Sequence, residues 1–188
     1  MMFDAIPRGL EVILLIVVLA AAVYDVRYRR IPNWLTGASV LMGLGVNTFL
    51  AFDRVERWSG LIGSAEGLAA GFCVYFVLYL MRAMGAGDVK LMAAIGSIVG
   101  PRDWFGIFFL TAIVGGIMAL LLVLARKRLK KTFFNLGFIF EEMSHGRPAY
   151  MRNEELDVKS GKSLGLPHGA VIAVGTLFFL GLTSPFIR

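Results

Sequence analysis

The sequence predicts an all-α, polytopic membrane protein with about six transmembrane helices, forming one membrane-embedded domain over residues 1–188. Two observations support this fold class. Of the residues, 57% are hydrophobic and only 17% are charged, and the mean hydropathy is +0.74. A soluble domain is typically about half apolar and about a quarter charged. In addition, the apolar residues gather in six runs, most of them near the length of about 20 residues that crosses a bilayer.

The first three runs are separated by short polar connections. The first run follows Arg8 and is expected to end in the basic stretch 27–33, because Pro32 disfavours helical backbone at Ile31. Asn33 is then placed to cap the second helix, which is expected to begin at Trp34. The predicted spans are residues 9–26, 34–52 and 60–82.

The last three runs are less regular. The fourth is short and begins at the glycine-rich string Gly85–Lys90, and Pro101-Arg102-Asp103 predicts a tight turn into the fifth. These spans are expected at residues 87–101, 104–125 and 167–186. The polar stretch 126–166 forms a long loop, in which the apolar piece 132–140 either lies in the membrane interface or packs on the bundle as an ordinary loop segment.

The basic residues predict how the chain is oriented. With six spans, the loops at 27–33, 82–90 and 126–166 share one side and hold 14 of the 19 Lys and Arg residues. The positive-inside rule puts these loops in the cytoplasm and both termini outside. We therefore expect a multi-pass protein of a bacterial inner membrane, with Asp25 and Asp88 both at the cytoplasmic face. The loop charges suit contact with anionic lipid, so nucleic acid is not an expected partner.

The sequence holds few residues that could ligate a metal. The single cysteine, Cys73, excludes a disulfide framework and is expected to be a small buried residue. His145 and His168 are far apart, with no carboxylate or cysteine at ligand spacing. We therefore predict no metal site and no cofactor.

Two aspartates are the candidate catalytic residues. Asp25 and Asp88 each lie at the end of an apolar run, where an ionisable group is costly and by default marks a functional site. Two carboxylates that share one proton can hydrolyse an amide, one activating water and the other protonating the leaving group. Such a pair titrates as a unit, and the sequence leaves open which aspartate is the acid.

The residues around the aspartates are candidates for binding substrate or shaping the site. Gly85 and Gly87 permit unusual backbone conformations and close approach of a substrate strand. The cationic side chains can hold lipid headgroups or keep a nearby carboxylate ionised. The candidates are Gly85, Gly87, Lys90, Arg30, Pro32 and Asn33. Glu66, deep in the third run, is expected to be a structural or accessory residue.

These strings resemble the motifs of a known family. Asp25 with Arg29-Arg30-Ile31-Pro32-Asn33, followed by Gly85-Ala86-Gly87-Asp88-Val89-Lys90, is similar to the type IV prepilin peptidases, which are Gly-x-Gly-Asp membrane aspartic proteases. The string Leu166–Ala173 also resembles the family's last-span motif. Together these similarities extend over about residues 25–180.

The resemblance implies a six-helical enzyme that uses Asp25 and Asp88. It implies cleavage of prepilin or pseudopilin leader peptides at the cytoplasmic face, typically after a glycine. Full-length members carry an N-terminal extension with paired cysteine motifs and also N-methylate the new terminus. This chain departs from that pattern in having one cysteine, so the resemblance leaves zinc binding and methyltransferase activity open. The compact form resembles the peptidases of tight-adherence (Flp-type) pilus systems.

The expected function is therefore a membrane aspartic endopeptidase whose partners are a prepilin-like substrate helix and lipid. No oligomeric state is predicted. Two alternatives stay open at this stage. A small proton-coupled transporter or channel could use both aspartates as relay groups, although the chain shows no internal repeat. A pilus assembly protein that has lost the chemistry could also keep the fold.

Overall fold

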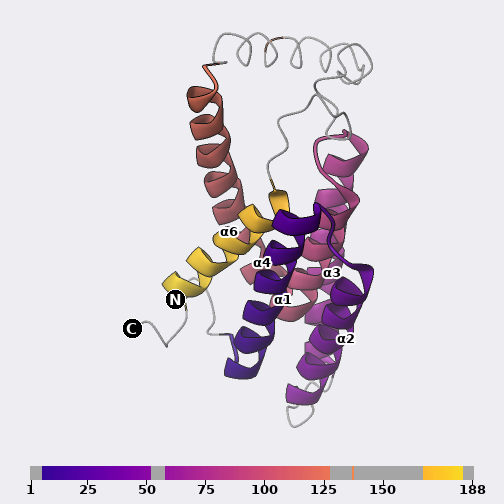
Figure 1. Ribbon diagram of the computed structural model, residues 1–188. Coiled ribbons are helices and arrows are strands. Elements are labelled where there is room, and N and C mark those ends of the chain that lie inside the picture. Colours follow the sequence, from indigo (N-terminus) through magenta and orange to yellow (C-terminus); the bar gives the residue numbers. More distant parts are fainter. Residues whose placement is uncertain (1–5, 52–57, 128–136, 138–166, 184–188) are drawn as a thin grey trace.

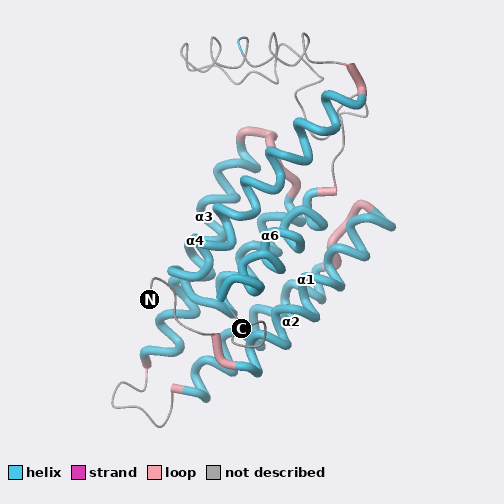
Figure 2. Tube along the Cα trace, turned by 90° about the vertical axis from the view of Figure 1, so that its left-hand side faces the viewer, coloured by secondary structure: helices cyan, strands magenta, loops and turns pink. Residues whose placement is uncertain are grey.

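The protein is a bundle of helices, described here from a computed structural model that covers residues 6–51, 58–127, 137 and 167–183. All regular secondary structure in these residues is helical, which confirms the all-α class. The helices are α1 (Arg8–Tyr28), α2 (Asn33–Leu50), α3 (Ser59–Leu80), α4 (Ala86–Ala125) and α6 (His168–Thr183). Most of them lie roughly along one direction (Figures 1 and 2), and α6 crosses them obliquely in Figure 1. The predicted interfacial piece at 132–140 and nearly all of the loop 126–166 lie outside the described residues.

Helix α4 is a helical hairpin rather than one long rod. Gly100 has a φ of 78° and a ψ of 174°, so the helix is interrupted there and resumes at Pro101. The Trp104 indole N–H donates a hydrogen bond of 3.1 Å to the carbonyl oxygen of Met92. In a straight helix these residues would be about 18 Å apart, so the chain folds back at Gly100. The reversal separates the predicted fourth and fifth spans. The predicted turn at Pro101-Arg102-Asp103 was wrong, because these residues are already helical and the break lies at Gly100.

Three of the described helices are long and apolar enough to cross a membrane by length and composition. They are α1, α3 and α4, whereas α6 is apolar but shorter. Large apolar side chains such as Ile16, Leu41 and Phe109 are exposed on the outer surface of the bundle, as expected where lipid replaces water. The described structure therefore supports a multi-pass membrane protein, and the count of six spans stays a prediction.

Helix α4 contacts every other described helix, and glycines allow it to approach α3 closely. A Cβ atom on Gly67 would overlap the backbone of Gly96, and one on Gly96 would overlap Gly67. Gly63 and Gly100 face each other in the same interface. Membrane helices commonly associate through such small residues spaced four apart, because lipid supplies no hydrophobic force between helices.

The packing of α3 also corrects one prediction. Its buried residues are Ser64, Gly67, Gly71 and Tyr75, which share one face. Cys73 lies off that face and is exposed, so the expectation of a buried cysteine was wrong. An apolar helix in a membrane can expose a cysteine to lipid at little cost, which is why the apolar run alone was misleading.

Candidate active site

Asp25 is held at the carboxyl end of α1 by the first turn of α6. Its side chain is only 9% exposed. The backbone N–H of Gly169 donates a 2.7 Å hydrogen bond to Asp25 Oδ2, joining residues 144 positions apart. Helix α1 ends just beyond, where Arg29 adopts a left-handed conformation and its N–H donates to the carbonyl oxygen of Asp25. The carboxylate therefore meets the amino-terminal end of α6, which attracts negative charge.

Asp88 lies in the first turn of α4 and is 8% exposed. The backbone N–H of Gly85 donates a 3.1 Å hydrogen bond to Asp88 Oδ2, so the side chain caps its own helix. Gly85 has extended backbone (φ −82°, ψ 155°) and precedes the helix. Both aspartates thus accept a single backbone hydrogen bond at a helix amino terminus, although one is in the last turn of its helix and the other in the first.

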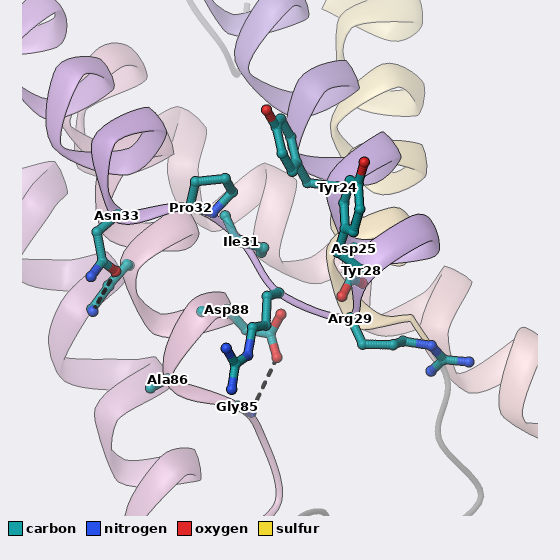
Figure 3. A pocket seen from close by; sticks show the side chains of 13 residues that line it. Tyr24, Asp25, Tyr28, Arg29, Ile31, Pro32, Asn33, Gly85, Ala86 and Asp88 are labelled. Carbon is teal, nitrogen blue, oxygen red and sulfur yellow. Dashed lines mark hydrogen bonds between the residues drawn. The ribbon is translucent and has the colours of Figure 1, made fainter.

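A pocket of about 650 Å³ brings the two motifs together (Figure 3). Every site residue predicted from the sequence lines it: Asp25, Arg30, Pro32, Asn33, Gly85, Gly87, Asp88 and Lys90. The other lining residues are Tyr24, Tyr28, Arg29, Ile31 and Ala86. Glu66, by contrast, is exposed on α3 and does not line this pocket.

Ile31 packs between the two aspartate-bearing regions. A Cβ atom added to Gly87 would lie 3.4 Å from Ile31 Cβ, and one added to Gly169 would lie 3.1 Å from Ile31 Cδ1. The same Cβ on Gly169 would lie 3.0 Å from Asp25 Cβ. A Cβ on Gly87 would make an ordinary contact with Ile31, whereas the absence of a side chain at Gly169 is what leaves room for Ile31 beside α6. Ile31 thereby fixes the 29–33 connection against the two helices.

Asn33 has a different role from the predicted helix cap. It is the first residue of α2, and the preceding Pro32 (φ −64°, ψ 138°) makes no side-chain capping bond. The Asn33 side-chain oxygen instead accepts a 2.8 Å hydrogen bond from Lys90 Nζ. The prediction was wrong because Lys90, which is distant in sequence, competes for the same oxygen. The bond ties the start of α2 to α4 at the rim of the pocket.

The two carboxyl groups form one electrostatic unit. Asp88 interacts electrostatically with both Asp25 and His168, the first residue of α6. An ionised carboxylate offers about four lone-pair sites, and the described structure satisfies one of them on each aspartate. The remaining acceptor capacity is available to a water molecule and to a substrate in the pocket. This arrangement suits general acid–base chemistry by a carboxyl pair.

Sequence reasoning did not select three residues that hold this site: Ile31, His168 and Gly169. Ile31 belongs to the string Arg29-Arg30-Ile31-Pro32-Asn33, but an apolar side chain has no acid–base or ligand chemistry that would mark it as a site residue. The string Leu166–Ala173 was noted as similar to a last-span motif, yet nothing in it identified Asp25 as its partner. Among the residues that the structure describes, no three His, Cys, Asp or Glu side chains group as a metal site.

Comparisons with a family model and with individual known proteins point to the same family. The model of the type IV leader peptidase family matches residues 12–120, which include both aspartates and the pocket-lining residues. That match covers more than half of the chain. It ends before α6, the helix whose first turn binds Asp25.

Curated relatives carry the name prepilin leader peptidase/N-methyltransferase. The protein from Bacillus subtilis (strain 168) is 28% identical over 133 residues, covering 68% of this chain and 49% of the relative. The protein from Escherichia coli (strain K12) is 29% identical over 118 residues, covering 61% of this chain and 51% of the relative. The protein from Stutzerimonas stutzeri is 29% identical over 112 residues, covering 58% of this chain and 38% of the relative. The chain thus spans about half or less of these relatives, and no solved structure gives a significant match.

Proposed function

Because this chain belongs to the type IV leader peptidase family, we propose that it is a membrane-embedded aspartic endopeptidase that removes the leader peptides of prepilin-like proteins. The observation that carries the proposal is the pair of buried carboxyl groups in one pocket. Asp25 and Asp88 come from different helices, interact electrostatically, and keep most of their acceptor capacity free of donors from the described residues.

The reaction needs one proton on the pair. The ionised aspartate takes a proton from water as that water attacks the scissile carbonyl carbon. The protonated aspartate hydrogen-bonds the carbonyl oxygen and then gives a proton to the departing amine as the C–N bond breaks. Gly85 and Gly87 shape the backbone beside Asp88, and Arg30, Pro32, Asn33 and Lys90 form the rim against which the substrate lies.

The substrate in this proposal is a helix anchored in the membrane, cut at the cytoplasmic face just after a glycine. The charge distribution supports the cytoplasmic side, because 14 of the 19 basic residues fall in the loops on the side of Asp25 and Asp88. In the same topology, α1, α2, α3, the two segments of α4 and α6 are the six spans, with both termini outside. The motif similarity supports an Flp-type prepilin as the first substrate to test.

The test is to co-express the chain with an Flp-type prepilin and to measure leader removal as a mass shift. Asp25→Asn and Asp88→Asn are compared with the unmodified protein at matched membrane levels. We expect cleavage after a glycine, and a loss of roughly 100-fold to 10,000-fold for each substitution, because each removes an acid–base group.

Cleavage that survives either substitution would overturn the two-aspartate mechanism. A set of Flp-type prepilins that are all left uncut by the unmodified protein, but cut by a related peptidase in the same cells, would overturn the peptidase proposal itself. Thermal unfolding of both variants in detergent separates lost chemistry from lost folding.

A further inference from the structure

The interface between α3 and α4 places one more polar side chain beside the catalytic pair. Along this interface the two helices run antiparallel and meet at steps of four residues. Gly67 faces Gly96, and Gly71 faces Met92, where a Cβ atom on Gly71 would overlap the Met92 backbone. Each step forward along α3 is matched by an equal step backward along α4, as the helical period requires.

The next step of the same register pairs Tyr75 with Asp88. Tyr75 lies four residues after Gly71, and Asp88 lies four residues before Met92. Both side chains belong to the buried set, Tyr75 with 1% and Asp88 with 8% of its surface exposed. The two groups also interact electrostatically. The register and the interaction agree that the Tyr75 phenol belongs to the surroundings of Asp88.

The hydroxyl of Tyr75 has unused hydrogen-bonding capacity. The ring packs edge-on against Phe108, with centroids 6.1 Å apart and planes at 81°. Among the residues that the structure describes, the hydroxyl makes no hydrogen bond. Buried tyrosine hydroxyls usually find a partner, and inside a membrane few waters replace one. Asp88 is the polar group that the helix register puts opposite it, and Gly85 occupies only one of the two Asp88 oxygens.

We propose that Tyr75 is a positioning residue of this peptidase, whose hydroxyl donates a hydrogen bond to the Asp88 carboxyl when substrate occupies the pocket. Gly85 then holds one side of the carboxyl and Tyr75 the other. Together they stop the group from rotating and aim it at the attacked carbonyl. This inference rests on the proposed function, and it adds a residue outside the motifs and outside the pocket lining.

The test is Tyr75→Phe, which removes one oxygen and keeps the ring packed on Phe108. Cys73→Ala, an exposed position on the same helix α3, is the control. Cleavage of a purified prepilin is measured in detergent to obtain kcat and KM separately, with thermal unfolding beside it. We expect kcat to fall roughly tenfold to 100-fold in Tyr75→Phe, as for a lost hydrogen bond to a charged group. KM and the unfolding temperature should stay near those of the unmodified protein, and Cys73→Ala should behave like that protein.

An unchanged kcat in Tyr75→Phe would overturn the inference. So would a loss that appears only in KM or only as a lower unfolding temperature, since a packing role would cause either. A failure of the proposed function looks different, because the unmodified protein itself would then leave the prepilin uncut.

Discussion

The two ends of the helix bundle differ in how their polar side chains are hydrogen-bonded. At the end away from the aspartates, the Asn47 amide nitrogen lies within 2.9–3.2 Å of four acceptors, on Gly43, Ser64, Ser97 and Ile98. The Ser64 hydroxyl also donates to the Ser97 carbonyl oxygen at 2.6 Å. At the end that holds the candidate site, Asp25 and Asp88 each accept one hydrogen bond from the described protein. Both clusters border a pocket, but the Asn47 donor is already engaged by three helices, whereas the two carboxylates keep acceptor sites that no described residue fills.

This difference is the one expected between a polar cluster that stabilises the fold and one that binds a ligand. A side chain whose hydrogen bonds are all made inside the protein gains nothing from a ligand, so its loss is felt as stability. A buried carboxylate with unused acceptor sites is costly to keep, and that cost is offset where water or substrate completes the site. We expect substitutions at the two ends to affect different measurements.

The largest effect that would sharpen this contrast is expected from Gly169→Ala. The added Cβ would lie 3.0 Å from Asp25 Cβ and 3.1 Å from Asp25 Oδ2, so the carboxylate must shift. The shift needed is a few tenths of an ångström. Since a displacement of about 1 Å at reacting groups can cost about 100-fold in rate, we expect a loss of cleavage of roughly tenfold. Prepilin cleavage kinetics measure it, with thermal unfolding as a check on folding.

Gly37→Ala is the control for this substitution, because nothing lies within 4 Å of a Cβ at that position. Cleavage should be unchanged in the control. If Gly169→Ala also cleaved at the normal rate, the first turn of α6 would not be setting the position of Asp25.

A second substitution, Asn47→Leu, tests the hydrogen-bonded cluster at the end away from the aspartates. It keeps the approximate volume but removes the donor that α3 and α4 share, and the helices lose hydrogen bonds within the membrane. Bonds of this kind contribute about 0.6 kcal/mol on average, and we expect a loss of about 1–2 kcal/mol for the whole cluster. Unfolding in a mixed micelle measures it. Cleavage per folded molecule should stay normal, and a selective loss of cleavage would show that the two ends are coupled.

The smallest effect is expected where the Lys90–Asn33 bond crosses the pocket rim. Lys90 is exposed and Asn33 is neutral, and even exposed pairs of opposite charge typically contribute only about 0.2–1 kcal/mol. We expect Lys90→Met and Asn33→Ala each to slow cleavage by less than about fivefold. A double-mutant cycle should give little further loss in the combined variant, because both single changes remove the same bond. Additive losses would instead mean that Lys90 and Asn33 act on the substrate separately.

The two motifs could be predicted because each is local in sequence. Asp25 and Asp88 were identified by their positions at the ends of apolar runs, since an ionisable group there is costly whatever the fold. Their neighbours Arg30, Pro32, Gly85 and Lys90 follow from the same strings, and all of them line the pocket. Local rules were less successful at Asn33 and Cys73, because Lys90 and the buried face of α3 decide those environments.

The sequence by itself determined the all-helical class, the membrane character and the choice of Asp25 and Asp88 as the candidate acids, because these depend on composition, apolar run length and short motifs. Only the tertiary structure decided which groups hold those acids. Gly169 reaches Asp25 across 144 positions, Ile31 packs between Gly87 and Gly169, and the α3–α4 register brings Tyr75 opposite Asp88. Each of these contacts depends on how closely helix backbones approach and in which register they meet. Backbone approach and register are set by packing across the whole bundle.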